Sequence, residues 1–88
     1  NFWEAYVLRG EYHINLRDKS SAIEDFENAL RVSPNHSRTG MTFYRLADLY
    51  LDQGNYDKAL TNIKSFINHV LLKHLIHSLD NLYGIMVR

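Results

Sequence analysis

The sequence resembles itself when it is shifted by 37 residues. Under this shift Gly10, Ala47 and Gly84 fall in register, and so do Ala22 and Ala59. Small residues that recur at a fixed period of this length are typical of a chain built from tandem structural units. Each unit of such a chain packs against the next, so we expect an extended stack that presents a surface to a partner.

The apolar residues of both units have the spacing of amphipathic helices. In the first unit, Ala22, Ile23, Phe26 and Leu30 lie along one helical stripe. An equivalent stripe follows in the second unit, and it consists of Leu60, Ile63, Ile67, Val70 and Leu71. No run of alternating apolar and polar residues suggests a strand, so the pattern predicts an all-α fold.

Capping and turn residues set the helix boundaries. Asp18 and Asn55 are suited to accept hydrogen bonds from first-turn amides and are 37 residues apart. Pro34 and Gly54 mark breaks. The sequence therefore predicts five helices, which form two hairpins and one further helix: residues 2–16, 19–32, 37–52, 56 to about 70, and about 73–88.

The last of these boundaries has an alternative. From Tyr56 to Tyr83 the chain contains neither proline nor glycine, so a single long helix would also fit. We favour a turn within residues 68–73, because the apolar residues after it form a stripe of their own that ends at Gly84. That glycine is in register with Ala47 of the preceding unit.

At these positions the chain resembles a tetratricopeptide repeat protein, whose signature is W-x2-L-G-x2-Y, then A-x3-F, then P. The second unit carries the signature as Phe43, Leu46, Ala47, Tyr50, Ala59 and Ile63. The turn residues Gly54 and Tyr56 lie between Tyr50 and Ala59. The first unit keeps Tyr6, Gly10, Ala22, Phe26, Ala29 and Pro34. The resemblance implies tandem antiparallel helical hairpins that form an α-α superhelix.

The chain departs from the family pattern in two respects. The first unit has Arg9 and His13 where leucine and tyrosine are typical, and the period exceeds the family's usual length of about 34 residues. We expect the extra residues to lengthen the start of the helix at 37–41. The resulting division is a single domain, 1–88, with repeats at 2–36 and 37–73 and a final helix at 74–88, and we expect it to be part of a longer protein.

In this family the first helix of each hairpin lines a concave groove, so the resemblance implies a partner site there. The expected groove residues are Glu4, Val7, Glu11, Ile14, Asn15, Met41, Tyr44, Arg45, Asp48, Leu51, Asp52, Ser78, Asn81 and Ile85. This mixture of acidic, apolar and aromatic groups suits a peptide with basic and apolar side chains. The alternative is an ordinary solvated surface.

Two features refine the expected groove. The Lys and Asn residues with which chaperone-binding members clamp a carboxylate are missing, since Val7 and Glu11 stand where that clamp would begin. Arg45 is the one groove cation, and we expect it to pair with Asp48 or Asp52 rather than with a ligand.

The chain ends suggest a second kind of contact, because terminal repeats usually need polar caps. Phe2 and Trp3 at one end, and Leu82, Ile85, Met86 and Val87 at the other, predict exposed apolar groups that neighbouring repeats or another copy of the chain would cover.

The sequence argues against catalysis, cofactors and metals. The Asp48 and Asp52 pair lies on one helix face without a partnering base. His69, His74 and His77 cluster in the sequence, but only His74 and His77 lie one turn apart, and two ligands rarely suffice for a metal site. Asn35 begins a formal glycosylation acceptor, which matters only in a secretory compartment.

Ten basic and ten acidic residues give no basic stripe for nucleic acid, and no stretch is apolar enough to insert into a membrane.

We therefore predict a non-enzymatic module that binds a protein or peptide. The alternatives are a peptide-sensing regulatory domain of a larger signalling or transcription-regulating protein, and a self-association module. The absence of cysteine fits a reducing compartment and slightly favours the cytoplasm.

Overall fold

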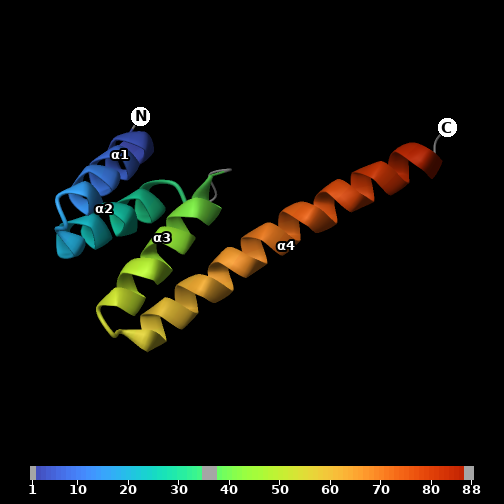
Figure 1. Ribbon diagram of the computed structural model, residues 1–88. Coiled ribbons are helices and arrows are strands. Elements are labelled where there is room, and N and C mark those ends of the chain that lie inside the picture. The colour runs from blue at the N-terminus through green and yellow to red at the C-terminus, as the bar shows by residue number, and fades with distance from the viewer. Residues whose placement is uncertain (1, 35–37, 87–88) are drawn as a thin grey trace.

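The computed structural model describes residues 2–34 and 38–86, and these residues form helices joined by short turns (Figure 1). The helices are α1 (Phe2–Asn15), α2 (Lys19–Val32), α3 (Thr39–Asp52) and α4 (Tyr56–Met86). The all-α prediction is confirmed for this part of the chain, and no strand occurs in it.

Both predicted capping residues act as expected. The Ser21 amide donates a hydrogen bond of 3.2 Å to the Asp18 carboxylate at the start of α2. The Lys58 amide donates one of 3.4 Å to the Asn55 side chain at the start of α4. The hydrogen bonds from Ser21 lower the pKa of the Asp18 carboxyl group. The α3–α4 turn also depends on Gly54, whose φ of 76° lies in the left-handed region that glycine adopts without strain.

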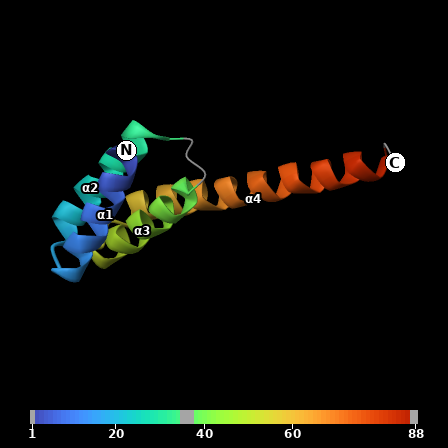
Figure 2. The same ribbon diagram turned by 90° about the horizontal axis from the view of Figure 1, so that it is seen from above.

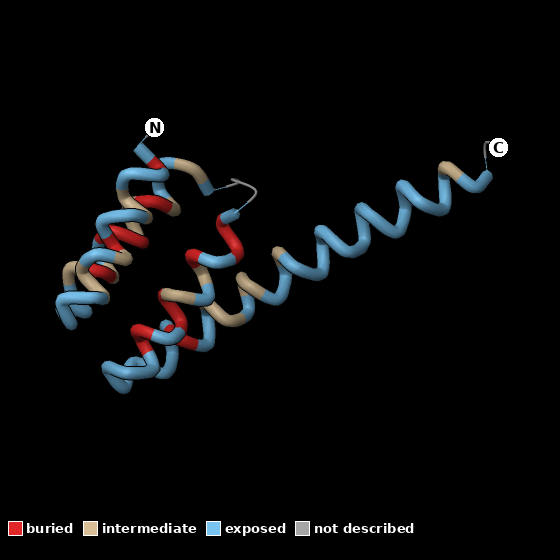
Figure 3. The backbone as a smooth tube through the Cα atoms, turned by 45° about the horizontal axis from the view of Figure 1, so that its top comes forward, coloured by how far each residue is buried: buried red, intermediate tan, exposed pale blue. Residues whose placement is uncertain are grey.

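The helices pack as two hairpins. Helix α1 lies against α2, α3 lies against the first half of α4, and α2 joins the hairpins by contacting α3 (Figures 1 and 2). The core runs through this body, and its buried residues are Ala22, Phe26, Leu46, Leu49, Tyr50 and Ala59. Figure 3 shows the buried positions concentrated where the helices face one another.

Small residues permit the close approach of the helices. A Cβ atom added to Gly10 would lie 2.9 Å from the Phe26 ring, and one added to Gly40 would lie 2.8 Å from the His69 ring. Ala22 and Ala59 are fully or almost fully buried at 0% and 1% exposure. Gly10, Ala22 and Ala59, which belong to the aligned small residues of the two repeats, therefore lie at helix contacts.

The predicted turn within residues 68–73 is wrong. Helix α4 runs without interruption over 31 residues, so the described chain has one long helix in place of the fourth and fifth expected helices. The physical reason is that no proline or glycine in this segment interrupts its backbone hydrogen bonding. The second half of α4 extends away from the other helices, and the molecule measures 53 × 30 × 20 Å (Figures 1 and 2).

The structure corrects two further expectations. Helix α3 begins at Thr39 and has 14 residues, as α1 and α2 do, so it is not longer than its counterparts. The expected helix start at 37 and the glycosylation acceptor at Asn35 fall at 35–37, outside the described residues. At the first end of the chain, Phe2 is 76% exposed as predicted, but Trp3 is buried and only 4% exposed.

Candidate functional site

A hollow lies between α1 and α3. It is lined by Trp3, Val7, Glu11, Phe26, Arg38, Met41, Thr42 and Arg45. Its volume of about 140 Å³ is below the roughly 300 Å³ at which small-molecule pockets begin. The hollow is therefore of a size to receive a side chain rather than a whole small ligand.

The lining of the hollow is mainly apolar. The buried rings of Trp3 and Phe26 contribute from α1 and α2, and Val7 packs against the core. Met41 on α3 is 59% exposed, so its flexible side chain is available to a partner at the rim. An incoming apolar side chain would thus meet apolar groups from three helices.

Two ion pairs connect α1 to α3 and to the residue that precedes it. The Arg45 guanidinium lies 3.0 Å from the Glu11 carboxylate, and Arg38 lies 3.7 Å from Glu4. The Arg38 guanidinium also lies over the Trp3 ring, 5.2 Å from its centroid. The predicted pairing of Arg45 with Asp48 or Asp52 is wrong, because the nearby helix α1 offers Glu11 across the hairpin boundary. Asp52 instead pairs with Lys19 at 3.2 Å.

The predicted groove residues do not lie together: some line the hollow, some pack against other helices, and some are exposed. Val7, Glu11, Met41 and Arg45 line the hollow, and Glu4 borders it through its ion pair with Arg38. Others lie elsewhere: Ile14 packs against the core, the Tyr44 ring meets the Phe66 ring on α4 at 5.6 Å, and Asn15, Asp48 and Leu51 are exposed. The hollow therefore contains only part of the predicted groove.

The last part of the predicted groove lies on the extended half of α4. Ser78, Asn81 and Ile85 are exposed there, beyond the body formed by the other helices (Figure 1). They were expected to line the groove as part of a separate final helix. Because α4 is continuous, they do not join the α1–α3 hollow.

Sequence reasoning missed Trp3, Phe26, Arg38 and Thr42 as lining residues. Trp3 was assigned to an exposed chain end, although its spacing to Tyr6, Val7 and Gly10 places it on the buried stripe of α1. That spacing was the signal that could have identified it. Arg38 precedes α3, and no sequence pattern links it to Glu4.

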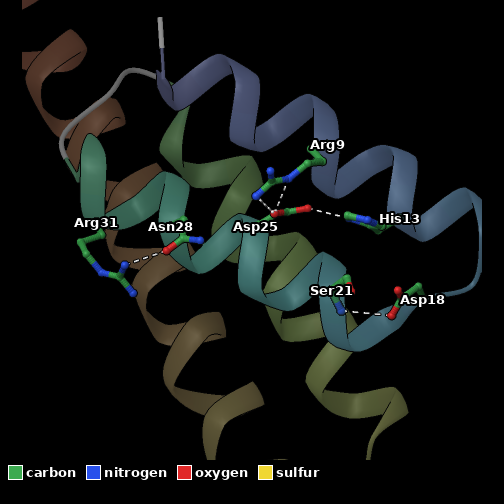
Figure 4. Close-up of polar contacts among 7 residues, drawn as sticks. All are labelled: Arg9, His13, Asp18, Ser21, Asp25, Asn28 and Arg31. Carbon is green, nitrogen blue, oxygen red and sulfur yellow. Dashed lines mark hydrogen bonds and ion pairs between the residues drawn. The ribbon is translucent and has the colours of Figure 1, made fainter.

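A buried carboxylate explains the unusual first repeat. Asp25 on α2 accepts hydrogen bonds from Arg9 Nε at 2.8 Å and lies 2.6 Å from His13 Nδ1 (Figure 4). The Asp25 side chain is 3% exposed, so it needs such partners. The hydrogen bond to Asp25 raises the pKa of Arg9. Arg9 and His13, which depart from the family pattern, therefore form one polar contact with Asp25 between α1 and α2.

The described residues contain no group of three histidine, cysteine or acidic side chains that could hold a metal ion. His74 and His77 lie with Lys73 on the exposed surface of α4. Among the described helices, none combines the length and the apolar character that a membrane span requires.

Comparison with family models identifies both hairpins. Residues 3–36 match a model described as tetratricopeptide repeat, and residues 41–69 match a second model with the same description. The chain belongs to the tetratricopeptide repeat family. The first match covers α1 and α2, and the second covers most of α3 and the first half of α4. No curated protein and no solved structure matches the chain.

Tetratricopeptide repeats generally mediate protein–protein interaction or act as scaffolds, and they are generally not catalytic. For this tetratricopeptide repeat chain the α1–α3 hollow lies between the first helices of its two repeats. It is thus the candidate site at which a protein partner would contact the repeats.

Proposed function

We propose that this tetratricopeptide repeat chain binds a protein or peptide by inserting a partner's apolar side chain into the α1–α3 hollow. The observation that carries the proposal is the apolar lining contributed by Trp3, Val7 and Phe26, with exposed Met41 at the rim. Burying an apolar side chain against such groups releases about 25 cal/mol for each Å² removed from water.

The Glu11–Arg45 ion pair beside the hollow offers charges with which charged groups of a partner can pair. Glu11 and Arg45 are each more than one third exposed, at 37% and 40%, so both remain accessible to a partner. A surface pair of this kind contributes little to stability. A partner's basic group can therefore replace Arg45 beside Glu11 at low cost, and an acidic group can replace Glu11 beside Arg45.

The binding experiment uses peptides selected from a random displayed library against the chain. We expect selected sequences to combine an apolar anchor with charged neighbours. Met41→Asp should weaken their binding at least about tenfold, because it places a charge where an apolar side chain would be desolvated. Titration calorimetry measures the change.

Leu8→Asp provides the matched control, because Leu8 is also exposed, at 66%, but does not line the hollow. It introduces the same charge into α1. Equal loss of binding in Leu8→Asp and Met41→Asp would count against the hollow as the site. Unchanged binding in Met41→Asp would refute it.

The regulatory alternative would use the same hollow and would require a neighbouring effector domain. It also predicts that Met41→Asp weakens peptide binding. It differs in predicting that peptide binding changes the activity of that effector. An interaction module without a sensing role would bind the peptide and leave the effector unchanged.

A further inference from the structure

The extended half of α4 carries an apolar face that no other described helix covers. Its central residues recur at alternating spacings of three and four, and we call them the α4 stripe: Leu72, Leu75, Leu79, Leu82 and Met86. All five are exposed, with Leu79 at 55% and Met86 at 75%. Ile76 and Tyr83 widen the same face.

This spacing is that of the a and d positions of a heptad, which places the stripe along one side of the helix. The other side is polar and holds Lys73, His74, His77, Asp80 and Asn81. A helix with one apolar and one polar face is built to pack against another helix. An exposed helix of this length that lacks tertiary contacts is marginal in water, so packing of the stripe would stabilise it.

The amount of exposed surface agrees with a missing contact. The chain has 6490 Å² of accessible surface, whereas a compact protein of 10.4 kDa exposes about 5,400 Å². Its radius of gyration is 15.7 Å, compared with about 12 Å for a compact domain of this length. The excess of roughly 1,100 Å² is comparable to the approximately 800 Å² that each partner buries in a standard protein interface.

We infer that the α4 stripe pairs with the α4 stripe of a second copy of this chain, in an antiparallel arrangement about residue 77. In this arrangement Leu72 faces Leu82 of the partner subunit, and Leu75 faces Leu79 of the partner subunit. The stripe is complementary to itself, because a leucine meets a leucine in each of these layers. Such self-complementarity is what a two-fold interface requires.

The charges of the chain do not oppose pairing with a second copy. The chain has a net charge of +0, so two copies do not repel each other overall. Within the extended half of α4 the charged residues are Lys73 and Asp80, which are of opposite sign. Both side chains lie on the polar face of α4, so the pairing leaves these two charges in water and buries neither of them.

This contact is separate from the α1–α3 hollow, since no residue of the α4 stripe lines that hollow. The dimer would therefore present two hollows, one on each body. Two binding sites held together increase the avidity for a partner that offers two matching segments.

Light scattering after size-exclusion chromatography tests the pairing on the intact chain. We expect the mass of a dimer that dissociates on dilution. Leu79→Lys should raise the dissociation constant at least about tenfold, because it places a charge in the centre of the apolar contact. Asn81→Lys is the matched control, since it adds the same charge on the polar face, and it should leave the dimer intact.

Fluorescence of the single tryptophan reports whether each variant is folded, because Trp3 is buried in the body and distant in sequence from the stripe. A monomeric mass at millimolar concentration would refute the pairing. Dimerisation that survives Leu79→Lys would also refute it, and would place the contact elsewhere. A monomer that forms a complex only with added library peptides through the stripe would assign the stripe to a different partner.

Disulfide trapping tests the orientation, because the chain has no cysteine of its own. An oxidised mixture of Leu75→Cys and Leu79→Cys chains should give mainly the mixed dimer, in which the two thiols face each other. Each variant alone should cross-link less. Efficient self-linking of Leu75→Cys would indicate parallel helices and contradict the antiparallel arrangement.

Discussion

The Tyr50 hydroxyl donates a hydrogen bond of 2.6 Å to the Glu27 carboxylate, and this bond ties the second repeat to the first. Tyr50 lies on α3 and Glu27 lies on α2, so the contact bridges the boundary between the hairpins. Tyr50 is 6% exposed and belongs to the central core cluster. The bond therefore holds the two repeats together at a buried position.

Removal of this bond should destabilise the stack. Tyr50→Phe keeps the ring but leaves the half-buried Glu27 without the hydroxyl, so we expect a loss of about 1 kcal/mol in the free energy of unfolding. For a domain of this size that corresponds to a fall in melting temperature of roughly 4 to 8 °C. Thermal unfolding followed by circular dichroism measures it. An unchanged melting temperature would show that the bond contributes nothing.

The same residue predicts a loss of stability in alkali. Burial and the hydrogen bond to Glu27 raise the pKa of Tyr50 to about 12, from about 10 in an unfolded chain. Because the folded form holds the proton more tightly, this contribution is fully present below pH 10 and is lost as the pH rises through 12.

The free energy of unfolding should therefore fall more steeply in that range for the unsubstituted chain than for Tyr50→Phe. Denaturant titrations at successive pH values test this. The comparison with Tyr50→Phe is needed because the chain has 6 tyrosines in all. Equal slopes for the two chains would contradict the assignment to Tyr50.

Because of the Asp25 contact, the residues that are typical of the family at positions 9 and 13 should lower the stability of the first repeat. Replacing Arg9 with leucine and His13 with tyrosine restores the typical pattern but leaves the buried Asp25 carboxylate without these partners. We expect the double variant to lose about 2 kcal/mol in the free energy of unfolding. Chemical denaturation measures the loss.

Adding Asp25→Ala to the double variant provides the control, because it removes the buried charge. The triple variant should recover part of the lost stability. A double variant as stable as the original chain, or a triple variant less stable than the double, would show that Asp25 does not depend on these partners.

Gly10 and Gly84 share a place in the sequence register but should respond oppositely to alanine. Gly10→Ala places a Cβ 2.9 Å from the Phe26 ring, and we expect a loss of about 1 to 3 kcal/mol through overpacking. Around Gly84 an added Cβ meets no atom within 4 Å, so Gly84→Ala should increase helicity, since alanine favours a helix by roughly 0.5 to 1 kcal/mol.

Circular dichroism and thermal unfolding of the two variants test this difference. Similar destabilisation by both would indicate that Gly84 is also a close helix contact. It would then contradict the exposed course of the last turns of α4.

The register and the helical periodicity predicted most of the body. Asp18 and Asn55 were identified as caps, and Ala22 and Ala59 as equivalent small residues, because capping and close packing leave a local signal in the sequence. The break within residues 68–73 was inferred from the separate apolar stripe that follows it and from the register of Gly84 with Ala47. A register indicates which residues are equivalent, but it does not interrupt hydrogen bonding in a helix that lacks proline and glycine.

The site was harder to predict because it depends on contacts between helices distant in sequence. Val7 and Met41 were found from the family's groove, whereas Arg38 and its pairing with Glu4 arise only when α1 and α3 are brought together. Asp25 illustrates the same limit. Its burial depends on Arg9 and His13, which come from a different helix.

The α1–α3 hollow is the surface at which we propose that a partner's apolar side chain binds. Amide chemical shifts of the chain, recorded by NMR during titration with a library-selected peptide, test it most directly. We expect shifts concentrated at residues 3–11 of α1 and 38–45 around the start of α3, with Met41 among the most affected. Shifts concentrated on α2 or on the extended half of α4, with those two segments unchanged, would contradict it.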